Sequence, residues 1–149
     1  MMEEQLLDQT AMNLQEPEYA GFWIRFAATF IDGIILSIPQ LAIQFTMADS
    51  IAEGGVGVAF YYMIMMLINW LYSAGMESSS NQATLGKMVV GVKVTNLEGE
   101  QISFINATGR YFAKLISAII LMIGYIMAAF SPKKQALHDQ LAKTLVVKK

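Results

Sequence analysis

The chain alternates long apolar stretches with shorter polar ones, and this pattern predicts most of its elements. Apolar residues dominate three stretches, at residues 21–45, 58–76 and 111–130. The first two contain about 20 residues or more, the length that an α-helix needs to cross a hydrocarbon core about 30 Å thick. We therefore predict two transmembrane helices, over about residues 21–45 and 58–76.

The third stretch has a different character. After Lys114 its one polar residue is Ser117, but the uninterrupted apolar part is short for a span. We predict a third membrane segment over about residues 110–130. It either crosses the bilayer, enters and returns with a bend near Gly124, or lies along the interface.

The polar stretch between the second and third apolar stretches predicts a small β-hairpin. Residues 89–94 are rich in valine, residues 95–100 carry turn-forming residues, and residues 101–104 alternate polar and apolar side chains. This succession is typical of two strands joined by a turn. We expect a cytoplasmic hairpin over about residues 88–104 in an otherwise all-α integral membrane fold. Residues 144–147 are a further strand candidate that would add to it.

The two ends of the chain are predicted to lie outside the membrane. Residues 1–18 carry five acidic side chains and no Lys or Arg. A secretory signal needs a basic start and then an apolar stretch, so this segment is interpreted as a solvated acidic tail. Residues 19–149 then form one membrane domain, with residues 131–149 as its C-terminal tail.

Composition supports a membrane protein and excludes several function classes. Of 149 residues, 55% are hydrophobic and 15% are charged, against about 25% charged in soluble domains. A net charge of −2 gives no electrostatic support for binding nucleic acid. The absence of cysteine excludes disulfides and thiolate chemistry.

The placement of basic residues predicts the topology. The loop at residues 46–57 has no Lys or Arg, and most of the ten basic residues fall between Lys87 and Lys149. Because basic residues favour the cytoplasmic side, we predict a multi-pass membrane protein with both termini cytoplasmic. A third stretch that crossed once would leave five C-terminal lysines outside, which favours the re-entrant or interfacial arrangement.

Arg25 and Asp32 are unusual residues for a membrane span. At 100° per residue they share an arc of roughly 140° with small and polar residues, namely Thr29, Gly33, Ser37, Gln40 and Gln44. An ionised carboxylate within a span costs at least roughly 2.5–3.5 kcal/mol, so Asp32 should be paired, protonated or in contact with water. A direct bond to Arg25 is not expected, because seven residues place the two about 10.5 Å apart along the axis.

Asn69 in the second helix is the expected partner of Asp32, since it should lie at a similar depth. Hydrogen bonds of this kind average roughly 0.6 kcal/mol in membranes. Two interpretations stay open at this point. Asp32 and Asn69 either join the two helices, or they take part in the passage of an ion or substrate, because ionisable groups in membranes are candidates for function.

The segment after the third stretch contains His138, the single histidine, next to Asp139. The pair lacks the spacing of a zinc site, and a helix cap with basic neighbours is the favoured interpretation. Motifs for a hydrolase elbow, a phosphate loop or a metal-binding helix are absent from the sequence. We expect a non-enzymatic protein with no metal site and no cofactor.

Several blocks, in this order and spacing, resemble the RDD family, which is named for one Arg and two Asp. They are Arg25 and Asp32 in the first helix, residues 82–87 and 91–94 after the second helix, Arg110, and residues 137–144. By this resemblance Arg25, Asp32 and Asp139 are the name-giving residues, and Gly86, Lys87, Arg110 and His138 belong to the family motif. Lys143 stands where the family often has a small residue.

The resemblance implies a protein of the bacterial inner (plasma) membrane for which transport has been suggested, with some members similar to sodium–proton antiporters. The favoured hypothesis is small-solute or ion transport, with cation/proton exchange through Asp32 and with Asn69 and Thr29 as neutral ligands. Its expected partners are the lipid bilayer, a small cation and a second copy of the chain in a homodimer. The alternative is a non-enzymatic membrane scaffold or assembly factor in which Arg25, Asp32 and Asp139 are structural contacts. In that alternative Arg25 and Asp139 bond to each other at the cytoplasmic interface.

Overall fold

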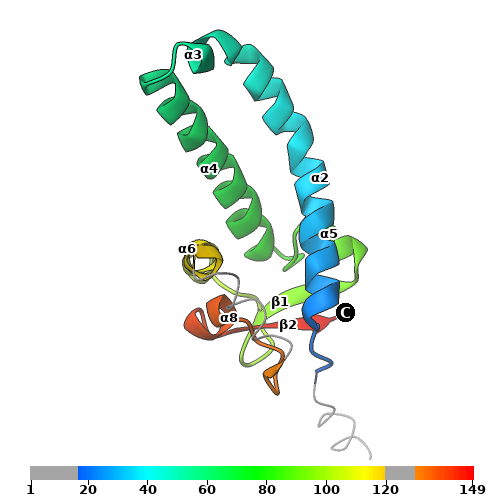
Figure 1. Ribbon diagram of the computed structural model, residues 1–149. Coiled ribbons are helices and arrows are strands. Elements are labelled where there is room, and N and C mark those ends of the chain that lie inside the picture. The colour runs from blue at the N-terminus through cyan, green and yellow to red at the C-terminus, as the bar shows by residue number, and fades with distance from the viewer. Residues whose placement is uncertain (1–16, 120–129) are drawn as a thin grey trace, which may run out of the picture.

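Two long helices and a small sheet make up most of the computed structural model, which describes residues 17–119 and 130–149. Helix α2 (Phe22–Thr46) and helix α4 (Val56–Glu77) are joined by the short helix α3 (Ala48–Ala52). The helices lie apart along most of their length and come closer where α4 ends (Figure 1). The two long helices predicted from the apolar stretches are confirmed, with bounds that differ by one or two residues.

Both long helices have the length and apolar composition needed to cross a membrane. Ala28 is the buried residue of α2, and Met65, Ala74 and Glu77 are the buried residues of α4. Large apolar side chains such as Ile38 and Phe45 are about three-quarters exposed, at 73% and 75%. Apolar surface of this extent is unfavourable in water, so these helices need lipid or protein around them.

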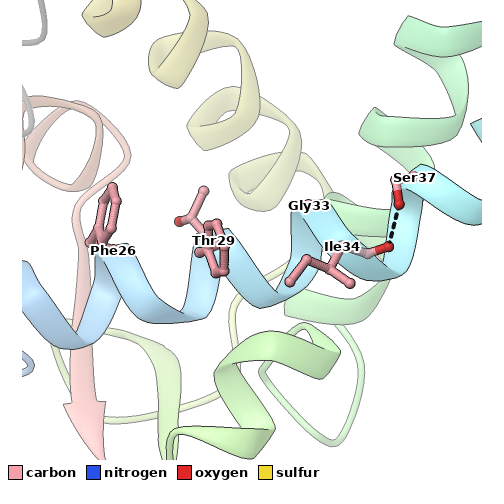
Figure 2. A pocket seen from close by; sticks show the side chains of 6 residues that line it. Phe26, Thr29, Gly33, Ile34 and Ser37 are labelled. Atoms are coloured by element: carbon pink, nitrogen blue, oxygen red, sulfur yellow. Dashed lines mark hydrogen bonds between the residues drawn. The ribbon is translucent and has the colours of Figure 1, made fainter.

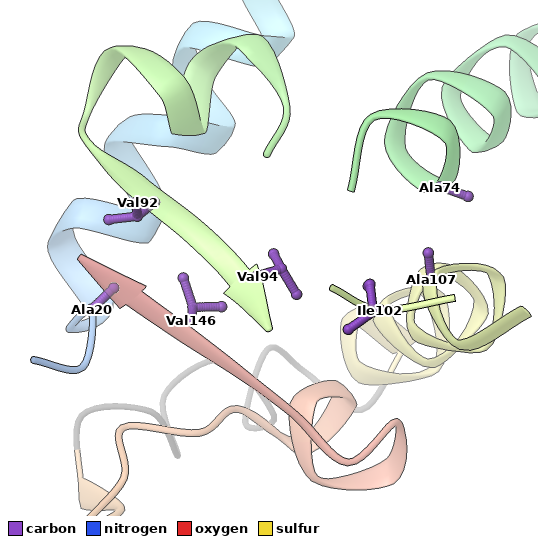
Figure 3. Close-up of a cluster of buried hydrophobic side chains, with 7 residues drawn as sticks. All are labelled: Ala20, Ala74, Val92, Val94, Ile102, Ala107 and Val146. Atoms are coloured by element: carbon purple, nitrogen blue, oxygen red, sulfur yellow. The ribbon is translucent and has the colours of Figure 1, made fainter. Parts of the chain in front are cut away.

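The remaining elements gather where α2 begins and α4 ends (Figure 1). They are helix α5 (Leu85–Val89), strand β1 (Val92–Asn96), helix α6 (Phe104–Ile119), helix α8 (Leu137–Leu141) and strand β2 (Thr144–Lys148). A small core joins them. Valines from both strands pack with Ala20, and Ala74 of α4 lies near Ile102 and Ala107 (Figure 3).

The predicted hairpin over residues 88–104 is wrong in its second strand. β1 pairs antiparallel with β2, with Val94 opposite Val146, and residues 101–103 precede α6 without forming a strand. The turn is present, since Gly99 has a positive φ of 84°, but Ile102 is buried in the core. Residues 144–147 are all buried and are the better partner for β1, so the C-terminal strand candidate is confirmed.

Helix α6 begins at Phe104, before the predicted start of the third membrane segment, and is strongly amphipathic. One side is buried and includes Ala107, Arg110, Ala113 and Ser117, while the other side is exposed and includes Phe104, Ile105, Phe112, Leu115 and Ile116. Figure 1 views α6 almost along its axis beside the end of α4, so it runs across the long helices. Residues 120–129, including Gly124, lie outside the described residues, and whether the segment spans or re-enters stays a prediction.

Helix α5 packs closely on α2 because Gly86 has no side chain. A Cβ atom at this position would lie 2.1 Å from the carbonyl oxygen of Ala28 and 2.8 Å from Cγ of Asp32. Both distances are far below ordinary van der Waals contact, and one of the two atoms belongs to the backbone. The close approach therefore depends on glycine.

We predict that Gly86→Ala separates α5 from α2 and lowers the free energy of unfolding by about 1–3 kcal/mol, the usual cost of overpacking. The matched control is Gly109→Ala in α6, where a Cβ would meet nothing within 4 Å and where alanine favours the helix. Thermal unfolding of both variants in detergent tests this. Equal unfolding midpoints for the two variants would contradict the prediction.

Candidate functional site

A network of buried charges lies where the long helices meet the small sheet, and Asp139 is one of its two acidic residues. Asp139 of α8 is fully buried. Its Oδ2 accepts a hydrogen bond from the backbone N–H of Ala136 at 3.0 Å and one from the guanidinium of Arg25. Its Oδ1 lies 2.8 Å from Nη1 of Arg110. One carboxylate therefore joins the start of α2 to both α6 and α8.

Arg25 has a contact for each of its guanidinium nitrogens. Besides Asp139, it donates from Nε to the carbonyl of Ala20 at 2.9 Å and from Nη2 to the carbonyl of Lys134 at 2.6 Å. A guanidinium suits this position because its donors have fixed, divergent directions. The sequence alternative that Arg25 and Asp139 bond to each other agrees with this geometry.

Glu77, at the end of α4, is the second acidic residue of the network and is 1% exposed. Its Oε1 accepts from Nζ of Lys114 at 3.0 Å and from Nζ of Lys87. Its Oε2 lies 3.1 Å from Nε of Arg110. Arg110 thus contacts both acidic residues, and it also donates to Oγ1 of Thr144 at 2.9 Å.

These six residues define the charge network: Arg25, Glu77, Lys87, Arg110, Lys114 and Asp139. Burial favours the neutral form of Asp139, but Arg110 and Arg25 outweigh it and hold the pKa of this carboxyl well below its usual range. Burial lowers the pKa of Lys87 to about 7, although Glu77 opposes the shift. Burial also lowers the pKa of His138 to about 3 despite the nearby Asp139, so His138 is neutral at neutral pH.

Asp32 lies outside this network and has its own set of donors. Its Oδ1 accepts from the Tyr72 hydroxyl at 2.6 Å and from the Gly86 backbone N–H at 2.7 Å. Its Oδ2 accepts from the Thr84 hydroxyl at 2.6 Å. The carboxylate therefore joins α2 to the end of α4 and to the start of α5.

The expected hydrogen bond between Asp32 and Asn69 is replaced by these contacts. Asn69 donates to the carbonyl of Met65 in its own helix at 2.7 Å, and Thr29 donates to the carbonyl of Arg25 at 3.0 Å. The physical reason is that α2 and α4 lie apart at mid-length and approach each other where α4 ends (Figure 1). A long Tyr72 side chain near the end of α4 reaches Asp32, and Asn69 bonds within its own helix.

Sequence reasoning missed four residues that the structure places around Asp32 or in the charge network. Tyr72 and Thr84 contact Asp32, and Glu77 with Lys114 completes the charge network. A signal for Glu77 was present, since it is the acidic residue that ends the second apolar stretch. Of the family-motif residues, Gly86, Lys87 and Arg110 all contact one of these carboxylates.

The arrangement supplies charge pairing and hydrogen bonds around Asp139. His138 Nε2 lies 3.5 Å from Oδ1 of Asp139, and Asp139 accepts from the Ala136 N–H at the start of α8, in agreement with the predicted helix cap. Among the described residues, no group of three or more His, Cys, Asp or Glu side chains could hold a metal ion.

Comparisons with known proteins agree with a membrane protein. The model of the RDD family matches residues 19–143. The chain is 44% identical to the uncharacterized protein YxaI of Bacillus subtilis, over 87% of this chain and 97% of that protein. It is 34% identical to the uncharacterized membrane protein YteJ of Bacillus subtilis, over 87% of this chain and 80% of that protein. No solved structure matches the chain.

We predict that Asp139→Asn lowers the free energy of unfolding by about 3–5 kcal/mol, because it leaves Arg25 and Arg110 buried without their shared counter-charge. The matched control is Glu98→Gln, which neutralises an exposed carboxylate. Unfolding midpoints of the purified proteins in detergent measure the effect. If the two neutralised variants unfold alike, Asp139 has no such role.

We predict that His138 makes the fold sensitive to mild acid. Because its pKa is about 3 in the folded protein and 6.5 in its ordinary state, the unfolded chain takes up a proton between these values and the folded chain does not. Stability therefore falls as pH drops below about 6.5, by about 2 kcal/mol between pH 7 and pH 5. Unfolding of wild type and His138→Gln at both pH values tests this, and an equal loss in the two proteins would argue against it.

Proposed function

The chain is a membrane protein of the RDD family, and on that premise we propose that it is a non-enzymatic membrane scaffold. One observation carries the proposal. Each of the three name-giving family residues bonds to elements distant in the sequence, with Arg25 paired to Asp139 and Asp32 bonded to Tyr72, Thr84 and Gly86. Residues used in this way stabilise the base of the two long helices, whose sides stay available for other membrane proteins.

The first such partner that we propose is a second copy of the chain, bound through α2. A shallow pocket along one side of this helix is lined by residues four apart, Thr29, Gly33 and Ser37, together with Phe26, Phe30 and Ile34 (Figure 2). Thr29, Gly33 and Ser37 are exposed and belong to the arc of small and polar residues around Arg25 and Asp32. Small residues at this spacing let two membrane helices approach closely. The side that is uncovered in one chain would be covered in a homodimer.

The proposed topology places both ends of the chain on the cytoplasmic side of the plasma membrane. Ala20 donates its backbone N–H to the carbonyl of Val146 at 2.8 Å, so the start of α2 and strand β2 lie on one side. The tail that contains β2 is also rich in lysine, which favours the cytoplasm. Because α6 and α8 both lie at this end of α2, the geometry supports a third segment that does not cross once.

A second candidate function is cation/proton exchange through Asp32. The observation in its favour is the pair of hydroxyl oxygens, from Tyr72 and Thr84, each 2.6 Å from the carboxylate. A hydroxyl both donates and accepts hydrogen bonds, so these groups would stabilise the free carboxylate and offer lone pairs to a small cation. Asp32 would then alternate between a proton and the cation.

One reconstitution separates the two functions. As a scaffold, the folded wild type in liposomes should show no proton flux driven by Na⁺ or K⁺ gradients. Asp32→Asn should lower thermal stability, because it removes the negative charge and replaces the oxygen that accepts from the Thr84 hydroxyl. A photoreactive amino acid at Ile34 should also cross-link two differently tagged copies. The same amino acid at Leu71, exposed on α4, is the matched control.

Cation-driven proton flux in wild type that disappears in a well-folded Asp32→Asn protein would overturn the scaffold proposal in favour of exchange. Cross-linking of equal strength at Ile34 and Leu71 would reject α2 as the dimer face.

A further inference from the structure

The charge network contains more cations than carboxylates. Arg25, Lys87, Arg110 and Lys114 are paired with two carboxylates, Glu77 and Asp139. The ammonium groups of Lys87 and Lys114 share the same oxygen, Oε1 of Glu77. In the part of the chain that the structure describes, no other carboxylate lies within ion-pair distance of either lysine. Buried charge of one sign is costly, so this surplus calls for a further anion.

The two lysines retain donors for that anion. Lys87 donates to Glu77, and Lys114 donates to Glu77 and, at 3.4 Å, to the hydroxyl of Ser73. An ammonium group has three donors, which leaves capacity on both nitrogens for another acceptor. The side chain of Lys114 is 23% exposed and that of Lys87 is 11% exposed. Lys114 is therefore the outer of the two and the point of access.

The depth of the lysine pair indicates where the anion comes from. Glu77 is the last residue of α4, and a helix of 22 residues is about 33 Å long, close to the thickness of the hydrocarbon core. The end of α4 therefore lies near the level of the lipid phosphates. Long lysine side chains at this level direct their ammonium groups to the head groups.

Helix α6 carries an exposed apolar side at the membrane depth of this lysine pair. Its depth is set by α4, since the indole N–H of Trp70 donates to the Thr108 hydroxyl at 3.1 Å and Lys114 contacts Glu77. The exposed side of α6 carries Phe112, Leu115 and Ile116. An apolar side at the depth of the last turns of a span fits the acyl chains of a lipid whose phosphate contacts Lys114.

We propose that Lys87 and Lys114 bind the phosphate of an anionic phospholipid at the cytoplasmic end of α4, with the acyl chains against the exposed side of α6. The lysine pair then has a counter-anion in addition to Glu77, the carboxylate that the described residues supply to it. Burial lowers the pKa of Lys87 to about 7, and a bound phosphate would favour its protonated form. The inference goes beyond the proposed function and holds equally for a scaffold and for an exchanger.

The test titrates the purified full-length chain, in maltoside detergent at neutral pH, with phosphatidylglycerol or phosphatidylcholine. Bound lipid is counted by native mass spectrometry, and the unfolding midpoint is followed in parallel. Phosphatidylglycerol should bind and raise the midpoint, and phosphatidylcholine should not. Lys114→Gln should weaken phosphatidylglycerol binding about tenfold, as expected for loss of one charge-assisted hydrogen bond.

Two further variants keep the result interpretable. Lys87→Met should also weaken binding, and methionine fills a buried lysine site without a new charge. Lys149→Gln, at an exposed lysine, changes the net charge by the same amount and should leave binding unchanged. If Lys114 had a structural role without binding lipid, Lys114→Gln would instead lower the unfolding midpoint by the same amount with either lipid.

Three results would overturn the inference. The first is equal binding of the two lipids to wild type. The second is an effect of Lys149→Gln as large as that of Lys114→Gln, which would indicate diffuse attraction. The third is an equal rise of the midpoint with inorganic phosphate alone, which would assign the lysines to a soluble phosphate and reject the lipid.

Discussion

The pairing of charges at the ends of two membrane helices is the constraint on which the rest of this fold depends. Arg25 begins one helix and Glu77 ends the other, and each needs an opposite charge where water is scarce. Arg110 contacts Glu77 and Asp139 together, so its guanidinium connects the two pairs. A buried charge without a partner costs several kcal/mol. Helices α6 and α8 therefore have to lie at this end of the long helices, because they carry Arg110 and Asp139.

This constraint also explains why the small sheet lies against the base of α2. The apolar core there is modest and consists mainly of valine and alanine side chains, which bury little area by themselves. The carboxylate of Asp32 contributes a second polar connection, to α4 and α5. Polar contacts thus determine the arrangement of the elements, and the valines complete it. The long helices are left almost uncovered, so their sides are available to lipid or to another protein.

The local sequence pattern predicted the elements better than their pairing. Apolar stretches of about 20 residues define α2 and α4 because a bilayer demands that length. The valine-rich segment predicted β1, but its partner was misassigned, since the nearest alternating segment is not the most buried one. Burial of residues 144–147 depends on tertiary contacts that no local pattern contains.

In the candidate site, too, individual residues were predicted better than their partners. Arg25, Asp32 and Asp139 were recognised from the family resemblance, and the pairing of Arg25 with Asp139 was named as an alternative. Asn69 was chosen for Asp32 on helical depth alone, which ignores how far apart two helices lie. Tyr72 and Glu77 could have been found by asking which polar side chains end the second apolar stretch. Lys114 was hidden because it interrupts an apolar segment and was interpreted as part of a membrane stretch.

The pairing of Arg25 with Asp139, across 114 positions of sequence, has a consequence for the order of events during synthesis. Both long helices leave the ribosome and enter the bilayer before α8 and β2 exist, since chains are made from the N-terminus. Until then Arg25 and Glu77 have to stay at the hydrated surface of the membrane, without Asp139 and Arg110. The last-made part of the domain therefore completes its folding, and an interrupted chain would be inserted but unfinished, a form that quality-control proteases could distinguish from the mature protein.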